Sequence, residues 1–191
     1  MRKAFLVLGI SVGFFCVTSL QAWAAQEWTG NINFTLGAKA LDEDDWEPAE
    51  DQGEFGINVD FRQKDWPVNI AVALRGAAAE DTFEGIDVES ATSELRFGVK
   101  KIWEPTGVMR PFLGGGLALV TGDIELEYLG DKFSDDDSGL GIWLEGGIYW
   151  TIGGAFNLGF EIGYSTAEVT LFGVDVNAGG GHAGLLLGYH W

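Results

Sequence analysis

The sequence contains two histidines, His182 in "GHAG" and His190 in "YHW", and these are the side chains best suited to acid–base chemistry near neutral pH. A hydrolase would need one of them to activate a serine, with an acid behind the histidine. Neither has a serine two residues further along the chain. We therefore expect both to be polar residues inside the fold, and the sequence assigns no catalytic, cofactor-binding or metal site.

Four charged residues could interact in another way. Glu145 and Glu161 stand on either side of a Gly-Gly pair, where a chain reversal would bring their carboxylates to the same depth. Two unneutralised carboxylates would repel each other, and one would hold its proton and could serve proton chemistry. Arg75 and Arg96 could instead neutralise them. Whether these residues meet depends on the elements that carry them.

Acidic residues dominate the charge, with 29 Asp and Glu against 11 Lys and Arg and a net charge of -18. A chain this acidic repels nucleic acid, so no nucleic-acid partner is expected. Two runs, "DEDDWEPAED" and "DKFSDDDSG", could collect divalent cations through carboxylate oxygens. They lack the glycine and terminal glutamate spacing of an EF-hand loop, so we expect solvated loop tips.

Nearly every segment of the chain alternates with a period of two, which predicts β-strands. In "EWTGNINFTLGAKA", Ile32 and Phe34 alternate with Asn31 and Asn33. Eight such segments are present, at residues 27–40, 54–62, 68–75, 93–101, 110–120, 139–150, 156–165 and 179–191. The expected fold class is all-β.

Eight antiparallel strands can close into an up-and-down barrel, and the connections indicate a transmembrane one. Three connections, "QKDWP", "WEPTGVMR" and "TIGGA", are short and contain turn residues. The alternate connections, at residues 41–53, 76–91, 122–138 and 166–179, are longer. Short turns at one end and long loops at the other are typical of transmembrane β-barrels. We expect the short turns and both termini in the periplasm and the long loops outside.

The alternative is a soluble barrel of the lipocalin kind, with its apolar face inward. The interior of an eight-stranded barrel is only just wide enough for side chains. The face rich in Gly, Ala, Asn and Ser fits that interior better than the face rich in Leu, Ile, Phe and Val. We therefore expect the polar face inside, where Lys39, Glu54 and Asp60 also lie. The expected lumen charge network, which fills the barrel and leaves no open pore, consists of Arg62, Arg75, Arg96, Lys100, Glu94, Glu145 and Glu161.

Tryptophan is sorted toward one end of the expected barrel. Its amphipathic ring favours the membrane–water interface. A soluble barrel has no reason to sort its tryptophans by strand end. Five of them fall at the short-turn end and predict a periplasmic aromatic girdle: Trp28, Trp66, Trp103, Trp150 and Trp191.

The first 24 residues are predicted to be a cleaved signal peptide. Residues 25–191 are predicted to form the barrel domain. Two basic residues precede the uncharged run "AFLVLGISVGFFCVTSL", and "AWA" supplies the A-x-A end. An uncleaved anchor is the alternative, but the run is short for a spanning helix of about 20 residues. Cys16 is the one cysteine and leaves with this segment, so the mature chain has neither a disulfide nor a Cys-ligated metal.

With this pattern, the whole mature chain resembles the small eight-stranded outer-membrane barrels of Gram-negative bacteria, the group that includes OmpX, the OmpA transmembrane domain and OmpW. "RPFLGGGLALV" (residues 110–120) is similar to the P-[YF]-x-G-x-G strand common in that group. In these families the last strand and its final aromatic are read by the barrel-assembly machinery. The residues that match this assembly signal are Leu185, Leu187, Tyr189 and Trp191. Barrel closure alone would explain their alternation but not the final aromatic.

The resemblance implies a monomer in the cell outer membrane after Sec-type export, without a cofactor, in contact with outer-membrane lipid and lipopolysaccharide. Some barrels of this kind modify lipid A, but the H-x-S spacing of barrel deacylases is absent here. Two function classes stay open. One is a non-enzymatic barrel with a structural, adhesive or envelope-stabilising role through acidic loops, whose carboxylates could bridge to lipopolysaccharide phosphates through Ca²⁺ or Mg²⁺. The other is a narrow-lumen barrel for passage or binding of a small solute.

Overall fold

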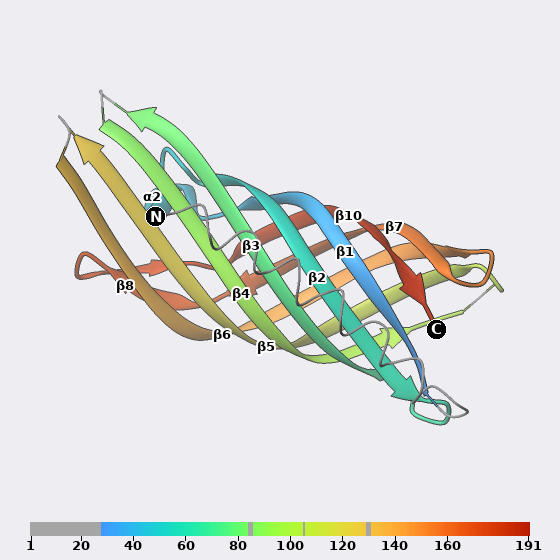
Figure 1. The fold of residues 1–191 in the computed structure, drawn as a ribbon. Helices are drawn as coiled ribbons and strands as arrows, with labels where there is room; N and C mark the ends of the chain where they lie inside the picture. The colour runs from blue at the N-terminus through green and yellow to red at the C-terminus, as the bar shows by residue number, and fades with distance from the viewer. Residues whose placement is uncertain (1–27, 84–85, 105, 129–130) are drawn as a thin grey trace, which may run out of the picture.

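Eight antiparallel strands close into one barrel in the computed structural model, which describes residues 28–191 except 84–85, 105 and 129–130 (Figure 1). The all-β, up-and-down barrel predicted from the sequence is thereby confirmed. The expected signal peptide, residues 1–24, lies outside the described residues. The barrel strands are β1 (Trp28–Ala40), β2 (Asp51–Gln63), β3 (Asn69–Phe83), β4 (Ile86–Ile102), β5 (Met109–Tyr128), β6 (Asp131–Ile152), β7 (Phe156–Thr166) and β10 (Gly180–His190).

The first and last strands close the barrel. β1 pairs with β10 from Asn31 opposite His190 to Ala40 opposite Gly181. Beyond the last strand, the backbone N–H of Trp191 donates to Gly30 O at 3.1 Å, and Gly30 N donates back to Trp191 O at 3.1 Å. The C-terminal residue therefore completes the ladder that leaves no open edge in the barrel wall.

The alternation places the apolar face outward. Leu36 and Leu140 are 70% and 72% exposed, whereas Asn33 and Thr35 on the other face of β1 are buried. The outward apolar residues form a continuous belt around the barrel, and an exposed belt of that extent requires lipid rather than water around it. The soluble-barrel alternative, which needs the apolar face inside, does not match this arrangement.

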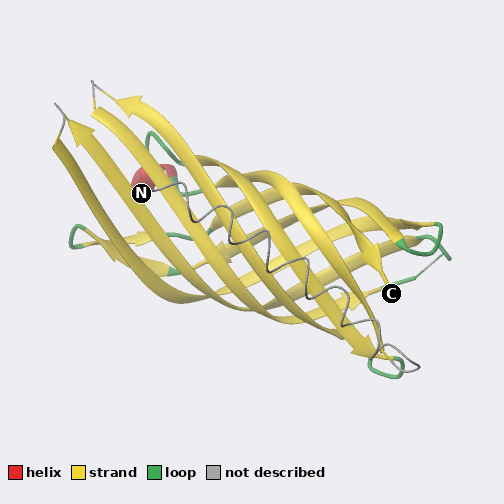
Figure 2. Cartoon of the chain, viewed as in Figure 1, coloured by secondary structure: helices red, strands yellow, loops and turns green. Residues whose placement is uncertain are grey.

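Four strands continue well beyond the belt, and here two predicted loops are wrong. Most of residues 76–91 and 122–138 are strand, because β3, β4, β5 and β6 extend past the rest of the barrel (Figure 2). The sequence pattern did not reveal these strands because many of the outward residues in these stretches are acidic, such as Glu89 and Asp123, although Val88 and Ile124 still alternate inward. We call this four-stranded extension, residues 76–83, 86–91, 121–128 and 131–138, the blade.

The other two predicted loops form a cap over the same end of the lumen. Residues 41–53 contain the short helix α2 (Glu43–Trp46) and the start of β2, and residues 166–179 contain the hairpin β8 (Glu168–Leu171) and β9 (Val174–Asn177). The side chain of Trp46 is 2% exposed and donates from Nε1 to Asn177 O at 2.9 Å. This outer cap packs in an apolar cluster that includes Leu41, Trp46, Val120, Trp143, Val169, Leu171 and Val176.

The opposite end of the barrel is formed by tight turns. Gly153 and Gly154 between β6 and β7 have φ of +62° and +78°, a backbone conformation that favours glycine. In the part of the chain that the structure describes, no helix is long and apolar enough to cross a membrane.

Candidate functional site

The lumen is filled with charged side chains. Of the ten charges that the sequence places on the polar face, nine are buried in the structure. They are Lys39, Arg75, Arg96, Lys100, Glu54, Asp60, Glu94, Glu145 and Glu161. Four cations thus face five carboxylates, and buried charges of this kind persist only when they are paired and hydrogen-bonded.

Arg75 is the centre of one cluster. From β3 it reaches across the lumen, and its Nη2 lies 2.5 Å from Glu161 Oε1 on β7 and 3.0 Å from Glu145 Oε2 on β6. Its Nη1 lies 2.8 Å from Glu54 Oε1 on the neighbouring β2. One guanidinium thereby neutralises carboxylates from three strands, and the fixed fork of donors in arginine suits this arrangement.

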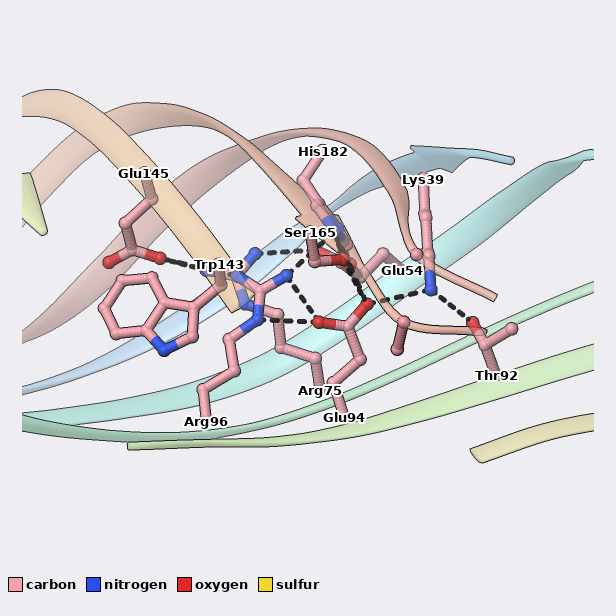
Figure 3. Close-up of polar contacts among 12 residues, drawn as sticks. Lys39, Glu54, Arg75, Thr92, Glu94, Arg96, Trp143, Glu145, Ser165 and His182 are labelled. Atoms are coloured by element: carbon pink, nitrogen blue, oxygen red, sulfur yellow. Dashed lines mark hydrogen bonds and ion pairs between the residues drawn. The ribbon is translucent and has the colours of Figure 1, made fainter. Parts of the chain in front are cut away.

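Arg96 is the centre of a second cluster nearer the cap (Figure 3). Its Nε donates to Glu94 Oε2 at 2.7 Å, its Nη2 lies 2.6 Å from the same oxygen, and its Nη1 lies 3.6 Å from Glu145 Oε2. The guanidinium also lies 5.9 Å from the ring centroid of Trp143, a cation–π distance. Glu145 therefore joins the two arginine clusters into one network.

Lys39 links this network to the outer cap. Its Nζ donates to Glu94 Oε1 at 2.8 Å, to Thr92 Oγ1 at 3.0 Å and to Ala178 O at 2.8 Å. All three donors of the ammonium are used, and the last one binds the chain between β9 and β10.

His182 lies with a serine and a glutamate in the order of a catalytic triad. Its Nε2 is 3.0 Å from Ser165 Oγ, and its Nδ1 is 2.5 Å from Glu54 Oε2. The sequence did not single out Ser165, because it lies on another strand and only the barrel pairing of β7 with β10 brings it close. The three residues meet because the barrel brings their strands together, not because they are close in the sequence.

The surroundings of these three residues argue against nucleophilic catalysis. Arg96 Nη2 is a donor 2.8 Å from His182 Nε2, so this nitrogen accepts, and we assign the proton to Nδ1 facing Glu54. Ser165 is fully buried and donates to Glu94 Oε1 at 2.9 Å. A triad serine must instead be accessible to a substrate and give its proton to the histidine. The arrangement is that of a polar core.

The lower lumen holds a third cluster. Lys100 Nζ lies 2.8 Å from Glu145 Oε1 and 4.6 Å from the ring centroid of Phe112. Asp60 Oδ1 accepts from Asn31 Nδ2 at 2.8 Å and from Asn69 Nδ2 at 2.5 Å. This cluster carries the network toward the short-turn end.

Arg62 was wrongly included in the lumen charge network. It lies at the short-turn mouth, where its side chain is 27% exposed, 3.6 Å from Glu104 and bonded to Trp66 O at 3.1 Å. Arg110, 2.7 Å from the same Glu104, closes that mouth with it. The position of Arg62 near the end of β2 places it beyond the enclosed part of the barrel.

The buried charged side chains occupy the middle of the lumen among the described residues. At the short-turn end, a cavity between Tyr149, His190 and Arg110 has a volume of about 10 Å³, space for at most one water. His190 there lies 3.0 Å from Asn31 Oδ1. A larger open hollow of about 390 Å³ lies where β1–β4 leave the belt, and its lining includes Leu36 and Phe55 on the outward face and Glu54 and Thr92 on the lumen face.

The outward face of the blade is acidic. Cross-strand pairs place Glu80 opposite Glu89, Glu89 opposite Glu125, and Asp123 opposite Asp136. Like charges directly opposite each other are unfavourable. Partial burial, together with the charges of Asp136 and Glu125, raises the pKa of Asp123. The sequence prediction of a solvated loop tip at "DKFSDDDSG" is wrong, because this run is the outer part of β6.

One lysine offsets part of this charge. Lys132 bonds to Glu125 and lies 3.0 Å from Glu127, and these two hydrogen-bonded carboxylates raise its pKa. Within the described ranges of the chain, no three His, Cys, Asp or Glu side chains converge so as to hold a metal ion. Divalent-cation bridging therefore stays a hypothesis without a preformed site.

The predicted aromatic girdle lies at the short-turn end of the barrel, and the predicted assembly signal runs along β10. The rings of Trp28 and Trp66 are 5.5 Å apart, and Trp103 and Trp150 are 46% and 39% exposed. Leu185, Leu187 and Tyr189, the outward residues of the predicted assembly signal, belong to the apolar belt, and each is about half-exposed or more. The final Trp191 packs its ring over Gly30.

No protein-family model matches this sequence, and no curated protein matches it significantly. Solved structures do match the fold. The attachment invasion locus protein Ail of Yersinia pestis aligns with a TM-score of 0.54 and 15% identity over 86% of this chain and 98% of Ail. A major outer-membrane protein of Thermus thermophilus gives a TM-score of 0.51 and 10% identity over 87% of this chain and 100% of its own. OprG of Pseudomonas aeruginosa gives a TM-score of 0.50 and 12% identity over 87% and 96%. The resemblance inferred from the sequence is thus confirmed in three dimensions, and the chain has the fold of the small outer-membrane β-barrel proteins.

Proposed function

We propose that this chain is a non-enzymatic integral outer-membrane protein that holds a rigid acidic blade outside the cell for adhesion or envelope stabilisation. The blade is the observation that carries the proposal. A protein that only anchored itself in lipid would need no strands beyond the belt, whereas β6 continues from Leu140 through nine further residues to Asp131.

One edge of the blade supports an adhesive role. β2 pairs with β3 only as far as Gly53 opposite Ala78, whereas β4 follows β3 to its end at residue 83. Residues 79–83 thus form a strand edge that β2 does not cover (Figure 1). A strand edge offers backbone donors and acceptors to an extended segment of another protein.

The proposal includes a location and partners. The barrel reaches the outer membrane by Sec-type export, is inserted by the barrel-assembly machinery through its last strand, and stays a monomer in contact with lipid and lipopolysaccharide. The apolar belt and the aromatic girdle support it. Ail was solved with sucrose octasulfate, a heparin analogue. The blade carboxylates and the net charge of -18 would repel such a polyanion, so we propose a cationic partner instead.

Shortening the blade tests the adhesive role. Residues 80–89 and 124–135 are each replaced by Asn-Gly, which closes the hairpins at the pairs Ala79–Ser90 and Asp123–Asp136 with favoured two-residue turns. Cells expressing the shortened protein should lose adhesion to surfaces coated with a cationic protein, while the barrel keeps its heat-modifiable gel mobility. Equal adhesion by both forms would contradict the proposal.

Orientation is tested by labelling whole cells with a membrane-impermeant maleimide. Glu43→Cys, on α2 in the outer cap, should react, and Gly107→Cys, in a short turn with open space around it, should not. The reverse result would place the blade in the periplasm.

Planar-bilayer recording separates this proposal from the solute alternative. Because charged side chains fill the lumen, we expect the wild-type protein to give a conductance no greater than the background. Discrete ohmic steps from the wild-type protein would instead favour a narrow channel.

A further inference from the structure

The tip of the β8–β9 hairpin carries an exposed aromatic in a strained conformation. The turn consists of Phe172 and Gly173, with φ of +50° and +79°. Two consecutive positive φ values are those of a type I′ turn, where Asn-Gly is the favoured sequence. A bulky side chain at the first of these positions is a conformational outlier, and such outliers persist where the surrounding structure holds them.

The surrounding structure holds this hairpin firmly. The backbone N–H groups of Thr170 and Phe172 donate to Asp137 Oδ2 at 2.8 Å and to Asp135 Oδ2 at 2.6 Å, both on β6. On the other side, Asn177 N donates to Asp45 Oδ2 at 2.9 Å. The inward side chains of the hairpin, Val169, Leu171 and Val176, are buried in the outer cap. The tip of the hairpin is therefore held in place by β6 and the outer cap.

The apolar side chains at this tip are exposed to solvent rather than to lipid. Phe172 is 53% exposed and Val174 is 61% exposed. Phe133 is 57% exposed and lies two residues beyond Asp135 on the same face of β6. Among the described residues, these are the large exposed apolar side chains that lie beyond the belt at the cap end. Exposed apolar groups gathered on a rigid element mark interaction sites.

The charge around the tip determines what it can bind. Asp131, Asp135 and Asp137 share with Phe133 one face of β6, and Asp135 and Asp137 bind the hairpin backbone beside Phe172. Asp175 follows Val174 on β9. The nearby Lys132 is already paired with two glutamates. We infer that the apolar tip formed by Phe172, Val174 and Phe133 docks a polypeptide segment of a partner protein that combines apolar and basic side chains. The inference rests on the proposed function in that it requires this end of the barrel to face outward.

The test uses the full chain in phosphatidylcholine nanodiscs and a fluorescent eight-residue peptide of alternating lysine and valine, with binding to empty discs subtracted. The wild-type protein should bind this peptide, and more weakly as salt rises. Peptides of alternating lysine and serine, or of glutamate and valine, should bind at least about tenfold more weakly, because one lacks the apolar groups and the other the positive charge.

Phe172→Asn is the informative variant. Asparagine accepts the left-handed backbone, so the hairpin should be retained or stabilised while peptide affinity falls about tenfold. Val108→Thr, an equally exposed apolar residue at the short-turn end, is the matched control and should bind like the wild type. Phe172→Asn binding as tightly as the wild type, or the lysine–serine peptide binding as tightly as the lysine–valine peptide, would overturn the inference.

The same assay separates this inference from the adhesive role of the blade. Glu80→Lys reverses a charge on the uncovered edge strand and leaves the hairpin untouched. If the tip is the docking site, Glu80→Lys reduces peptide affinity far less than Phe172→Asn. A loss confined to Glu80→Lys would support the edge and refute the tip.

Discussion

The guanidinium of Arg75 lies 2.5 Å from the carboxylate of Glu161, on the opposite wall of the barrel. Because Arg75 is the cation paired with Glu161 among the described residues, and also contacts Glu54 and Glu145, its removal leaves Glu161 buried without an ion pair beside two further carboxylates. We expect Arg75→Met, which keeps an unbranched side chain of similar length, to lower the free energy of unfolding by about 3–5 kcal/mol. Urea unfolding in detergent micelles measures this change.

Lys132→Met on the blade is the control for this prediction. Lys132 is exposed and also contacts two carboxylates, so its loss should not change the urea midpoint measurably. Equal midpoints for Arg75→Met and the wild type would show that the lumen network contributes nothing to stability.

Ser165 should be chemically inert. It lies 3.0 Å from His182 Nε2, but it is fully buried and its hydroxyl donates to Glu94. A fluorophosphonate probe, which labels activated serines, should therefore give no adduct on the folded protein, as judged by intact mass spectrometry. A Ser165 adduct that disappears in His182→Gln would contradict the polar-core interpretation and reveal a hydrolase.

Deletion of Trp191 should block assembly. The residue contributes two backbone hydrogen bonds to Gly30, and its carbonyl also accepts from Thr29 Oγ1 at 2.8 Å. Unpaired backbone groups at the edge of the closing strands cost several kcal/mol each in lipid. We expect the truncated chain to be exported but to accumulate as periplasmic aggregate, seen as loss of heat-modifiable mobility. Normal mobility would show that β10 closes the barrel without its last residue.

Asp123 should make the blade more stable in acid than at neutral pH. Its pKa is raised in the folded protein by partial burial and by Asp136 and Glu125. The ionised form therefore opposes folding above the raised pKa, and the penalty disappears below the unfolded value of about 3.9. Asp123→Asn should have a higher urea midpoint than the wild type at pH 7 and the same midpoint at pH 3. A variant that is no more stable at pH 7 would contradict this.

The barrel could be predicted from the sequence because its strands obey two rules at once. Outward residues such as Leu36 suit lipid, and inward residues such as Thr35 suit a narrow lumen. The alternation of the two residue types therefore identified both faces of each strand. The blade was missed because its outward face lies in water. There the alternation runs between apolar residues such as Val88 and acids such as Glu89, in runs whose high charge resembles that of loops.

The lumen network was only partly predictable for a different reason. Alternation identified which charges point inward, but it did not distinguish Arg62, at a mouth, from Arg96, in the enclosed part. The contacts of His182 with Ser165 and Glu54 depend on strands that are far apart in the sequence and on the register with which the barrel closes. The spacing of residues along one strand does not predict the register in which the strands pair.

Lys39 has a consequence for how the outer cap moves. Its ammonium is bonded at once to Glu94 in the lumen and to the carbonyl of Ala178 next to the cap hairpin. Lifting the cap would leave a buried donor without its acceptor, so the cap and the barrel interior should open together as one cooperative unit. Amide hydrogens of Val169 and Val176 would then exchange with deuterium as slowly as those of the barrel wall, unlike those of a hinged lid.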